Sequence, residues 1–243
     1  MPPPRPSRGV SGERTGSHLF AFSRRFSPPL LIILLLSGGC DVFNRLPAGV
    51  DVSNPKSAAQ GYLSAIQRGD ARSARALSAG TGEQKQWVDA IAGLVDGMRA
   101  FDKAIYAKFG RIEYQIHTDM HESISALADE PLALISDGYV SEDGDRARVD
   151  PAKGKSFTAK SQSSIYLLHQ KDGWRVDLLQ TYAPGSIDAG KTGDVSASFH
   201  EYQRIGDIFR AIAWQVSAGF FKTPDDAARA LGERLKSAYA ESQ

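Results

Sequence analysis

The chain has 243 residues, of which 42% are hydrophobic and 23% charged, and its formal net charge is +1. These values are typical of a globular protein, and they exclude a disordered chain and a membrane protein with several spans. Residues 1–39 hold five Arg and one Glu, whereas residues 40–243 hold 24 basic and 27 acidic residues, so the body is mildly acidic and we expect no nucleic acid as partner.

The leader ends with RRFSPPLLIILLLSGGC, residues 24–40. Two arginines precede seven aliphatic residues, Leu30–Leu36, and a run of seven is too short to cross a bilayer. Positive charge, a short apolar run and then small residues are typical of a bacterial secretory signal. We therefore predict a signal peptide over residues 1–39.

The SGGC ending resembles the lipobox of bacterial lipoproteins. That resemblance implies that the thiol of Cys40, the only cysteine, receives a diacylglyceryl group and that the signal is cut just before it. The chain departs from the pattern at Ser37, where the family prefers an aliphatic residue. The resemblance predicts an extracytoplasmic protein attached by lipid to the bacterial cell membrane, with inner and outer membrane both open. The alternative is an ordinary cleaved signal followed by a buried cysteine.

Helix signals dominate the first part of the mature chain. Residues 40–53 are polar and predict a tether. Asn54 and Pro55 predict the start of a first helix, and Asp70 predicts the cap of a short second one. Apolar positions at helical spacing predict a long third helix over about 83–109, followed by Gly110. We also expect a short helix over about 119–128.

The sequence HTDMHE at 117–122 raises the question of a metal site. On a helix, His117 and His121 would lie one turn apart, with Asp119 or Glu122 nearby. It lacks the glutamate that directly follows the first histidine in the HExxH motif. A solvated polar connection is the simpler interpretation, so we predict no metal and no cofactor.

The periodicity then changes to that of strands, separated by turns at EDGD (142–145) and KDG (171–173). The predicted strands are 132–140, 146–150, 157–170 and 174–182. A two-residue turn at Asp172-Gly173 would pair Leu167 with Leu178. Ile165, Leu167, Val176 and Leu178 would then share one apolar face, which the helices would cover. Helical spacing returns after a polar loop and predicts a pair of C-terminal helices within 195–240, the second capped by Thr223 with Pro224 at its start.

Two segments resemble the cone-shaped α+β fold of nuclear transport factor two, ketosteroid isomerase and SnoaL-like proteins. They are AAQGYLSAIQRGDARSARAL (58–77) and SIYLLHQKDGWRVDLL (164–179). The resemblance implies N-terminal helices packed on a curved antiparallel sheet over 54–182, around an apolar pocket that Ile165, Leu167, Val176 and Leu178 would line. It does not imply one activity.

Ketosteroid isomerase-like members bring a carboxylate base and a hydroxyl donor together in such a pocket. The candidates here are Asp137, Asp150, Asp177, Tyr166 and Tyr182. The predicted register points Asp177 away from the apolar face, and no pair can be chosen. We expect His169 to be a partly exposed strand-end histidine, and Trp87, Trp174 and Trp214 to be core residues.

The sequence therefore predicts a lipid-anchored protein whose domain binds a small apolar ligand or a protein partner without catalysis, as a monomer or a homodimer. One alternative is an isomerase- or dehydratase-like enzyme that uses a pocket Asp and Tyr. A second is a structural envelope protein without a ligand pocket.

Overall fold

The computed structural model describes residues 46–110, 122, 125, 129–153, 155, 164–183 and 192–240, without the side chains of 192–195. The described chain is a mixture of helices and one five-stranded sheet that is not closed. The helices are α1 (Pro55–Gln67), α2 (Ala71–Ala76), α3 (Gly82–Phe109), α5 (Glu130–Ser136), α6 (Leu178–Tyr182), α7 (Thr192–Ser217) and α8 (Pro224–Ala240). The strands are β1 (Ser78–Ala79), β2 (Tyr139–Asp143), β3 (Arg146–Asp150), β4 (Ile165–Gln170) and β5 (Gly173–Asp177).

The predicted helix starts are confirmed by their caps. Asn54 Oδ1 accepts a hydrogen bond from the Ser57 amide at 3.0 Å, and Asp70 accepts one from Ser73 in the same way. The start of α3 is a capping box, in which the side chain of Thr81 and that of Gln84 each bond the other's amide. The two predicted C-terminal helices are also present, as α7 and α8.

The strand order is β1-β5-β4-β3-β2. Strands β2 to β5 form an antiparallel meander, as predicted, but β1 pairs with β5 in parallel. The prediction of a purely antiparallel sheet is therefore wrong at this edge. Helix α2 is followed directly by β1, and the sequence SA is too short for its periodicity to signal a strand.

The predicted register of the β4–β5 hairpin is wrong by two residues. Gln170 pairs with Gly173 and Leu167 pairs with Val176, so Lys171 and Asp172 form the turn. Gly173 is the first residue of β5, where a side chain would be crowded, because a Cβ at this position would lie 2.5 Å from the Val52 carbonyl oxygen. A shift of two residues preserves the side-chain faces, so Ile165, Leu167 and Val176 still share the buried face.

Two predicted strands contain helices instead. Residues 132–136 of the first lie in α5, which begins with Glu130 and Pro131. The end of the last forms α6, because Asp177 caps it by accepting a hydrogen bond from the Gln180 amide at 3.1 Å. The helix expected over 119–128 lies outside the described residues except for 122 and 125, as does the first part of the strand expected over 157–170.

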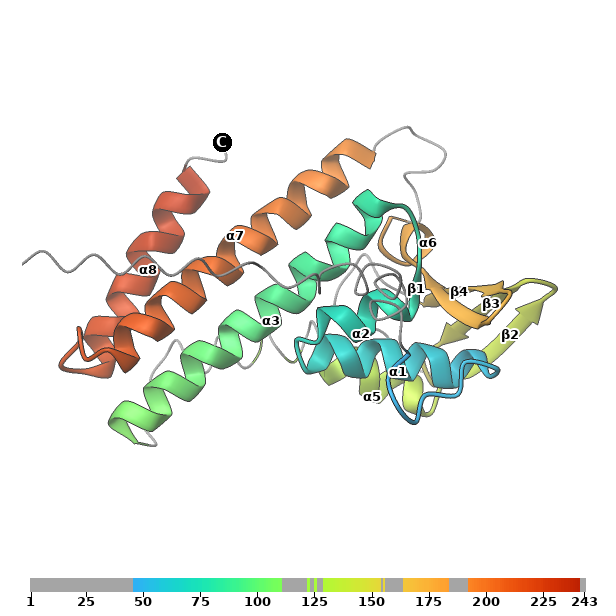
Figure 1. The fold of residues 1–243 in the computed structure, drawn as a ribbon, viewed down its shortest axis with the longest axis horizontal. Coiled ribbons are helices and arrows are strands. Elements are labelled where there is room, and N and C mark those ends of the chain that lie inside the picture. The colour runs from blue at the N-terminus through green and yellow to red at the C-terminus, as the bar shows by residue number, and fades with distance from the viewer. Residues whose placement is uncertain are drawn as a thin grey trace, which may run out of the picture. The chain divides into compact units, whose positions relative to one another are not determined.

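The described chain has two clusters of buried apolar side chains. In the first cluster, α1, α2 and the N-terminal half of α3 pack with the inner face of the sheet. The second cluster lies between the C-terminal half of α3, α7 and α8. Figure 1 shows α3 and α7 side by side, running in the same direction, with α8 returning beside α7. Helix α3 is therefore common to both clusters.

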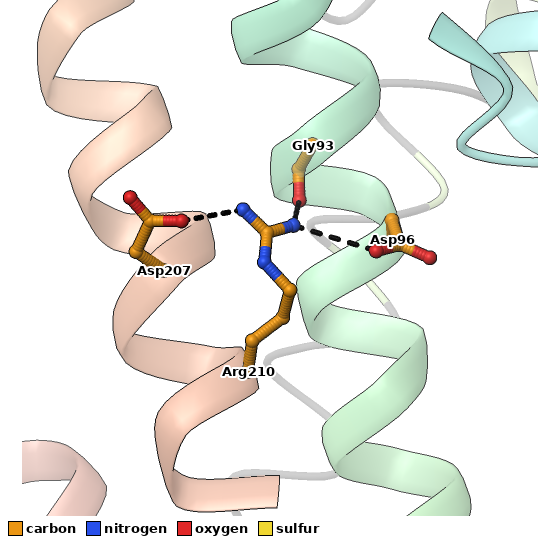
Figure 2. A network of polar contacts seen from close by, with 4 residues as sticks. All are labelled: Gly93, Asp96, Asp207 and Arg210. Atoms are coloured by element: carbon orange, nitrogen blue, oxygen red, sulfur yellow. Dashed lines mark hydrogen bonds and ion pairs between the residues drawn. The ribbon is translucent and has the colours of Figure 1, made fainter. Parts of the chain in front are cut away.

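Glycines bring α3 and α7 into close contact. A Cβ at Gly97 would lie 2.4 Å from the Gly206 carbonyl oxygen, and one at Gly206 would lie 2.8 Å from that of Gly93. Gly93 and Gly97 are one helical turn apart, the spacing that lets two helix backbones approach closely. Figure 2 shows Arg210 of α7 across the same crossing, donating to the Gly93 carbonyl at 2.7 Å and facing Asp96 of α3 and Asp207 of its own helix.

Candidate functional site

The four residues predicted to line an apolar pocket lie in the first core cluster. Ile165, Leu167, Val176 and Leu178 are all buried. Helix α1 packs over them, and its side chains Tyr62, Leu63 and Ile66 belong to the same cluster. The first three share a face of the sheet, while Leu178 reaches the core from the start of α6. The inner face of the sheet is thus covered by helices, as the alternation of its strands predicts.

The five candidate catalytic residues are spread over different parts of the domain. Asp177 caps α6, and Asp150 accepts hydrogen bonds from Arg148 at 2.9 Å and Ser164 at 2.5 Å. Asp137 is exposed at the end of α5. Tyr182 bonds another tyrosine in the core, and Tyr166 lies half-buried on the outer face of the sheet.

The Tyr182 hydroxyl and the Tyr62 hydroxyl lie 2.9 Å apart. The Tyr182 ring also contacts Phe199 edge-on, and Phe199 stacks on Trp87 with ring centroids 5.2 Å apart. Burial raises the pKa of Tyr182 to about 12 and raises the pKa of Tyr62 well above its usual value. Both hydroxyls are therefore protonated at neutral pH, and they are suited to holding α1 against α6 rather than to acting as bases.

The open surface of the sheet is its outer face, opposite α1. A groove of about 340 Å³ lies there between β2, β3, β4 and the start of α6. Sequence reasoning did not predict it, although the alternation of Arg146 and Arg148 with buried Ala147 and Val149 is a signal for a polar outer face. The groove is lined by Ser141, Glu142, Asp143, Arg146, Ala147, Arg148, Tyr166, Leu167, Leu168, Asp177 and Gln180.

Charges of both signs line this groove. Arg148 is held by Asp150, whereas no described residue forms an ion pair or hydrogen bond with the exposed side chain of Arg146. Asp143 of β2 lies opposite Arg146 in the register, and Asp177 lies at the other side. Such a groove is suited to a polar, hydrogen-bonding partner and not to an apolar molecule.

The remaining candidate residues have simple structural roles or lie elsewhere. His169 is exposed at the end of β4 and contacts the Trp174 ring edge-on, as expected for a strand-end histidine. Trp87 and Trp174 are core residues, but the same prediction is wrong for Trp214, which is exposed. His117 and His121 lie outside the described residues. Within the described ranges, no group of His, Cys, Asp and Glu is arranged to hold a metal ion.

Comparison with protein-family models, curated proteins and solved structures finds no match for this chain. In the part that the structure describes, no helix is both long and apolar enough to span a bilayer.

Proposed function

We propose that the chain is an extracytoplasmic lipoprotein, anchored at Cys40, whose domain binds a partner protein without catalysis. The anchor half of the proposal is supported by the order of arginines, apolar run and SGGC in residues 24–40. Of the predicted tether, residues 46–53 are part of the domain instead, because Leu46, Val50 and Val52 pack on the first core cluster. Two or three acyl chains on Cys40 would hold the protein stably on a membrane, where one chain would not.

The proposal that the domain does not catalyse a reaction is carried by one observation: the candidate acid–base groups already make hydrogen bonds within the protein. Asp150 and Asp177 already accept structural hydrogen bonds, and the Tyr182 hydroxyl is paired with Tyr62. A general base must reach the proton that it abstracts. Asp150 and Tyr182 face other side chains instead, and Asp177, which lines the groove, already uses its Oδ1 to cap α6. The alternative of an isomerase- or dehydratase-like enzyme loses its best candidates for that reason.

The partner surface in this proposal is the polar groove on the outer face of the sheet. Arg146 offers a guanidinium with no described partner, and Tyr166 and Gln180 offer further hydrogen-bonding groups. An extended polar segment of another protein suits an open groove of this kind better than a small apolar ligand does. The second alternative, a purely structural envelope protein, would leave this groove without a role.

The cone-type fold is part of the same proposal. Its support is the element order of a helix pair, a short strand and a long helix, followed by an antiparallel meander whose inner face packs on the helices. The helical pair α7 and α8 would be an addition to that fold. The cone-type fold hosts binding modules as well as enzymes, so it is compatible with a non-catalytic role.

The anchor is tested by expressing the full chain and its Cys40→Ala variant in a bacterial host with radiolabelled palmitate. We expect label and membrane fractionation for the unaltered chain and neither for the variant. Equal labelling of the two proteins, or a soluble unlabelled wild-type protein, would exclude lipid attachment at Cys40.

The groove is tested by placing a photo-crosslinking amino acid at Tyr166 in cells of the source organism, with Lys171 in the exposed β4–β5 turn as the matched control. We expect one protein adduct at Tyr166, lost on Arg146→Glu, and none at Lys171. Adducts at both positions would indicate unspecific contact. A small molecule retained by the purified domain in native mass spectrometry would favour the ligand-binding or enzyme alternatives.

A further inference from the structure

The helical arm, formed by α7, α8 and the C-terminal half of α3, exposes two large aromatic side chains next to each other at the end where α7 leads into α8. Trp214 near the end of α7 is 64% exposed, and Phe220 in the α7–α8 turn is 67% exposed. Their ring centroids lie 5.7 Å apart, so they form one continuous apolar surface. Large exposed aromatic pairs are uncommon on a protein surface that faces only water, and they mark contact sites.

Basic side chains accompany this pair. Lys108, at the end of α3, places its Nζ 3.6 Å from where a Cβ of Gly219 would lie, and Lys222 follows Phe220 by two residues. Segments 103–110 and 214–224 meet at this end, and together they contain three lysines and no Asp or Glu. Asp102 directly precedes the first segment and Asp225 directly follows the second, while Asp226 is paired with Arg229 at 2.8 Å. We call Trp214, Phe220, Lys108 and Lys222 the aromatic tip.

A lipid surface is the partner whose chemistry this combination fits. Tryptophan and other aromatic rings sit well at the headgroup level of a bilayer, and lysines beside them bind anionic headgroups. The remainder of the mature chain is mildly acidic, so a basic aromatic spot on it is a local feature of the tip. A second copy of this acidic chain would offer no matching excess of negative charge at its own basic tip.

We infer that the aromatic tip is a second membrane contact, which binds anionic lipid headgroups and inserts Trp214 and Phe220 at the interface. This inference rests on the proposed attachment at Cys40, which brings the domain to a membrane.

Cys40 lies six residues before Leu46, which packs on the first core cluster, and six extended residues reach about 20 Å. The tip lies at the other end of α3, whose 28 residues span about 42 Å.

The fluorescence of Trp214 reports on the environment of the aromatic tip, because the other two tryptophans are buried. Residues 41–243 contain both core clusters, so this unlipidated protein is mixed with vesicles of phosphatidylcholine, with and without anionic phosphatidylglycerol. We expect co-sedimentation and a blue shift of tryptophan emission with the anionic vesicles. Phe220→Ser should lower the partition coefficient about tenfold or more, and Lys108→Gln and Lys222→Gln about fivefold each. Tyr239→Ser, an exposed aromatic at the end of α8 away from the turn, should leave it unchanged.

Two results would overturn the inference. One is an absence of binding to anionic vesicles, or binding that Phe220→Ser leaves intact. The other is a blue shift without lipid that grows with protein concentration, because it would assign the tip to a contact between two copies. Since the protein tested carries no lipid, this result is independent of whether Cys40 is acylated, and each proposal can fail without the other.

Discussion

At the scale of single residues, the Tyr62–Tyr182 hydroxyl pair is a polar contact between α1 and α6 at the first core cluster. Among the described residues, neither hydroxyl has a second hydrogen-bond partner, and Tyr62 is fully buried while Tyr182 is partly buried. A buried hydroxyl that loses its only hydrogen-bond partner costs the folded state the full desolvation energy of that group. If both tyrosines were replaced by phenylalanine, no hydroxyl would be left without a partner. The pair therefore joins α1 to α6 only while both hydroxyls are present.

This asymmetry gives a mutational prediction. Tyr62→Phe should lower the free energy of unfolding by about 1–3 kcal/mol, because it leaves the Tyr182 hydroxyl unpaired. The double variant Tyr62→Phe/Tyr182→Phe should recover most of that loss. Urea denaturation of the four proteins of the cycle gives the coupling energy. Additive losses in the double variant would show that the hydroxyls are satisfied by water.

The same pair predicts a decline of stability in alkali. In the unfolded chain the tyrosines ionise near their ordinary pKa of about 10, whereas burial raises the pKa of Tyr182 in the folded state to about 12 and that of Tyr62 as well. Above pH 10 the folded state thus binds more protons than the unfolded state, so the free energy of unfolding falls as pH rises. We expect wild type to lose about 2–3 kcal/mol more than the double Phe variant between pH 9 and 11, about half of it from each tyrosine, measured by urea denaturation. Parallel curves for the two proteins would contradict this.

At the scale of elements, caps and periodicity predicted α1, α2, α3, α7 and α8, because their signals are local in the sequence. The signals for α5 and α6 were also present, as Glu130-Pro131 and the Asp177 cap, but short apolar runs do not distinguish a helix from a strand. The close crossing of α3 and α7 could not be predicted. Gly93 and Gly97 show the right spacing, yet nothing local assigns Gly206 as their partner. The groove depends in the same way on how distant strands meet.

The close crossing of α3 and α7 predicts opposite effects on stability for two Gly→Ala substitutions. Gly97→Ala should destabilise the protein by about 1–3 kcal/mol, because its methyl group would overlap the Gly206 carbonyl oxygen. Gly232→Ala is the matched control, since it lies inside α8 with nothing within 4 Å of a new Cβ. It should stabilise the protein by up to about 1 kcal/mol through helix propensity. Thermal unfolding of both variants decides the point, and equal stabilisation would mean that α3 and α7 do not approach this closely.

At the scale of the whole molecule, the two core clusters share two helices, α3 and α7. Helix α3 runs without interruption from Gly82 to Phe109, its first half in the first cluster and its second half in the other. Tyr202 of α7 packs against both clusters. Loss of either cluster would leave half of α3 with an uncovered apolar face, and a helix without tertiary packing is only marginally stable in water. We therefore expect the arm and the sheet to unfold together.

Cavities placed in each cluster test this cooperativity. Leu63→Ala in the first cluster should cost about 2–5 kcal/mol and Phe101→Ala in the second about 3–5 kcal/mol. If the clusters are one cooperative unit, each variant lowers the midpoint of a single transition. Hydrogen exchange read by mass spectrometry should then show peptides of β4–β5 and of α8 losing protection together in both variants. If instead Phe101→Ala releases α8 while β4 and β5 keep wild-type protection, the arm is a separate unit that opens by itself. That outcome would leave the sheet and its groove intact while the aromatic tip moved freely, so the groove and the tip would have to be treated as independent binding surfaces.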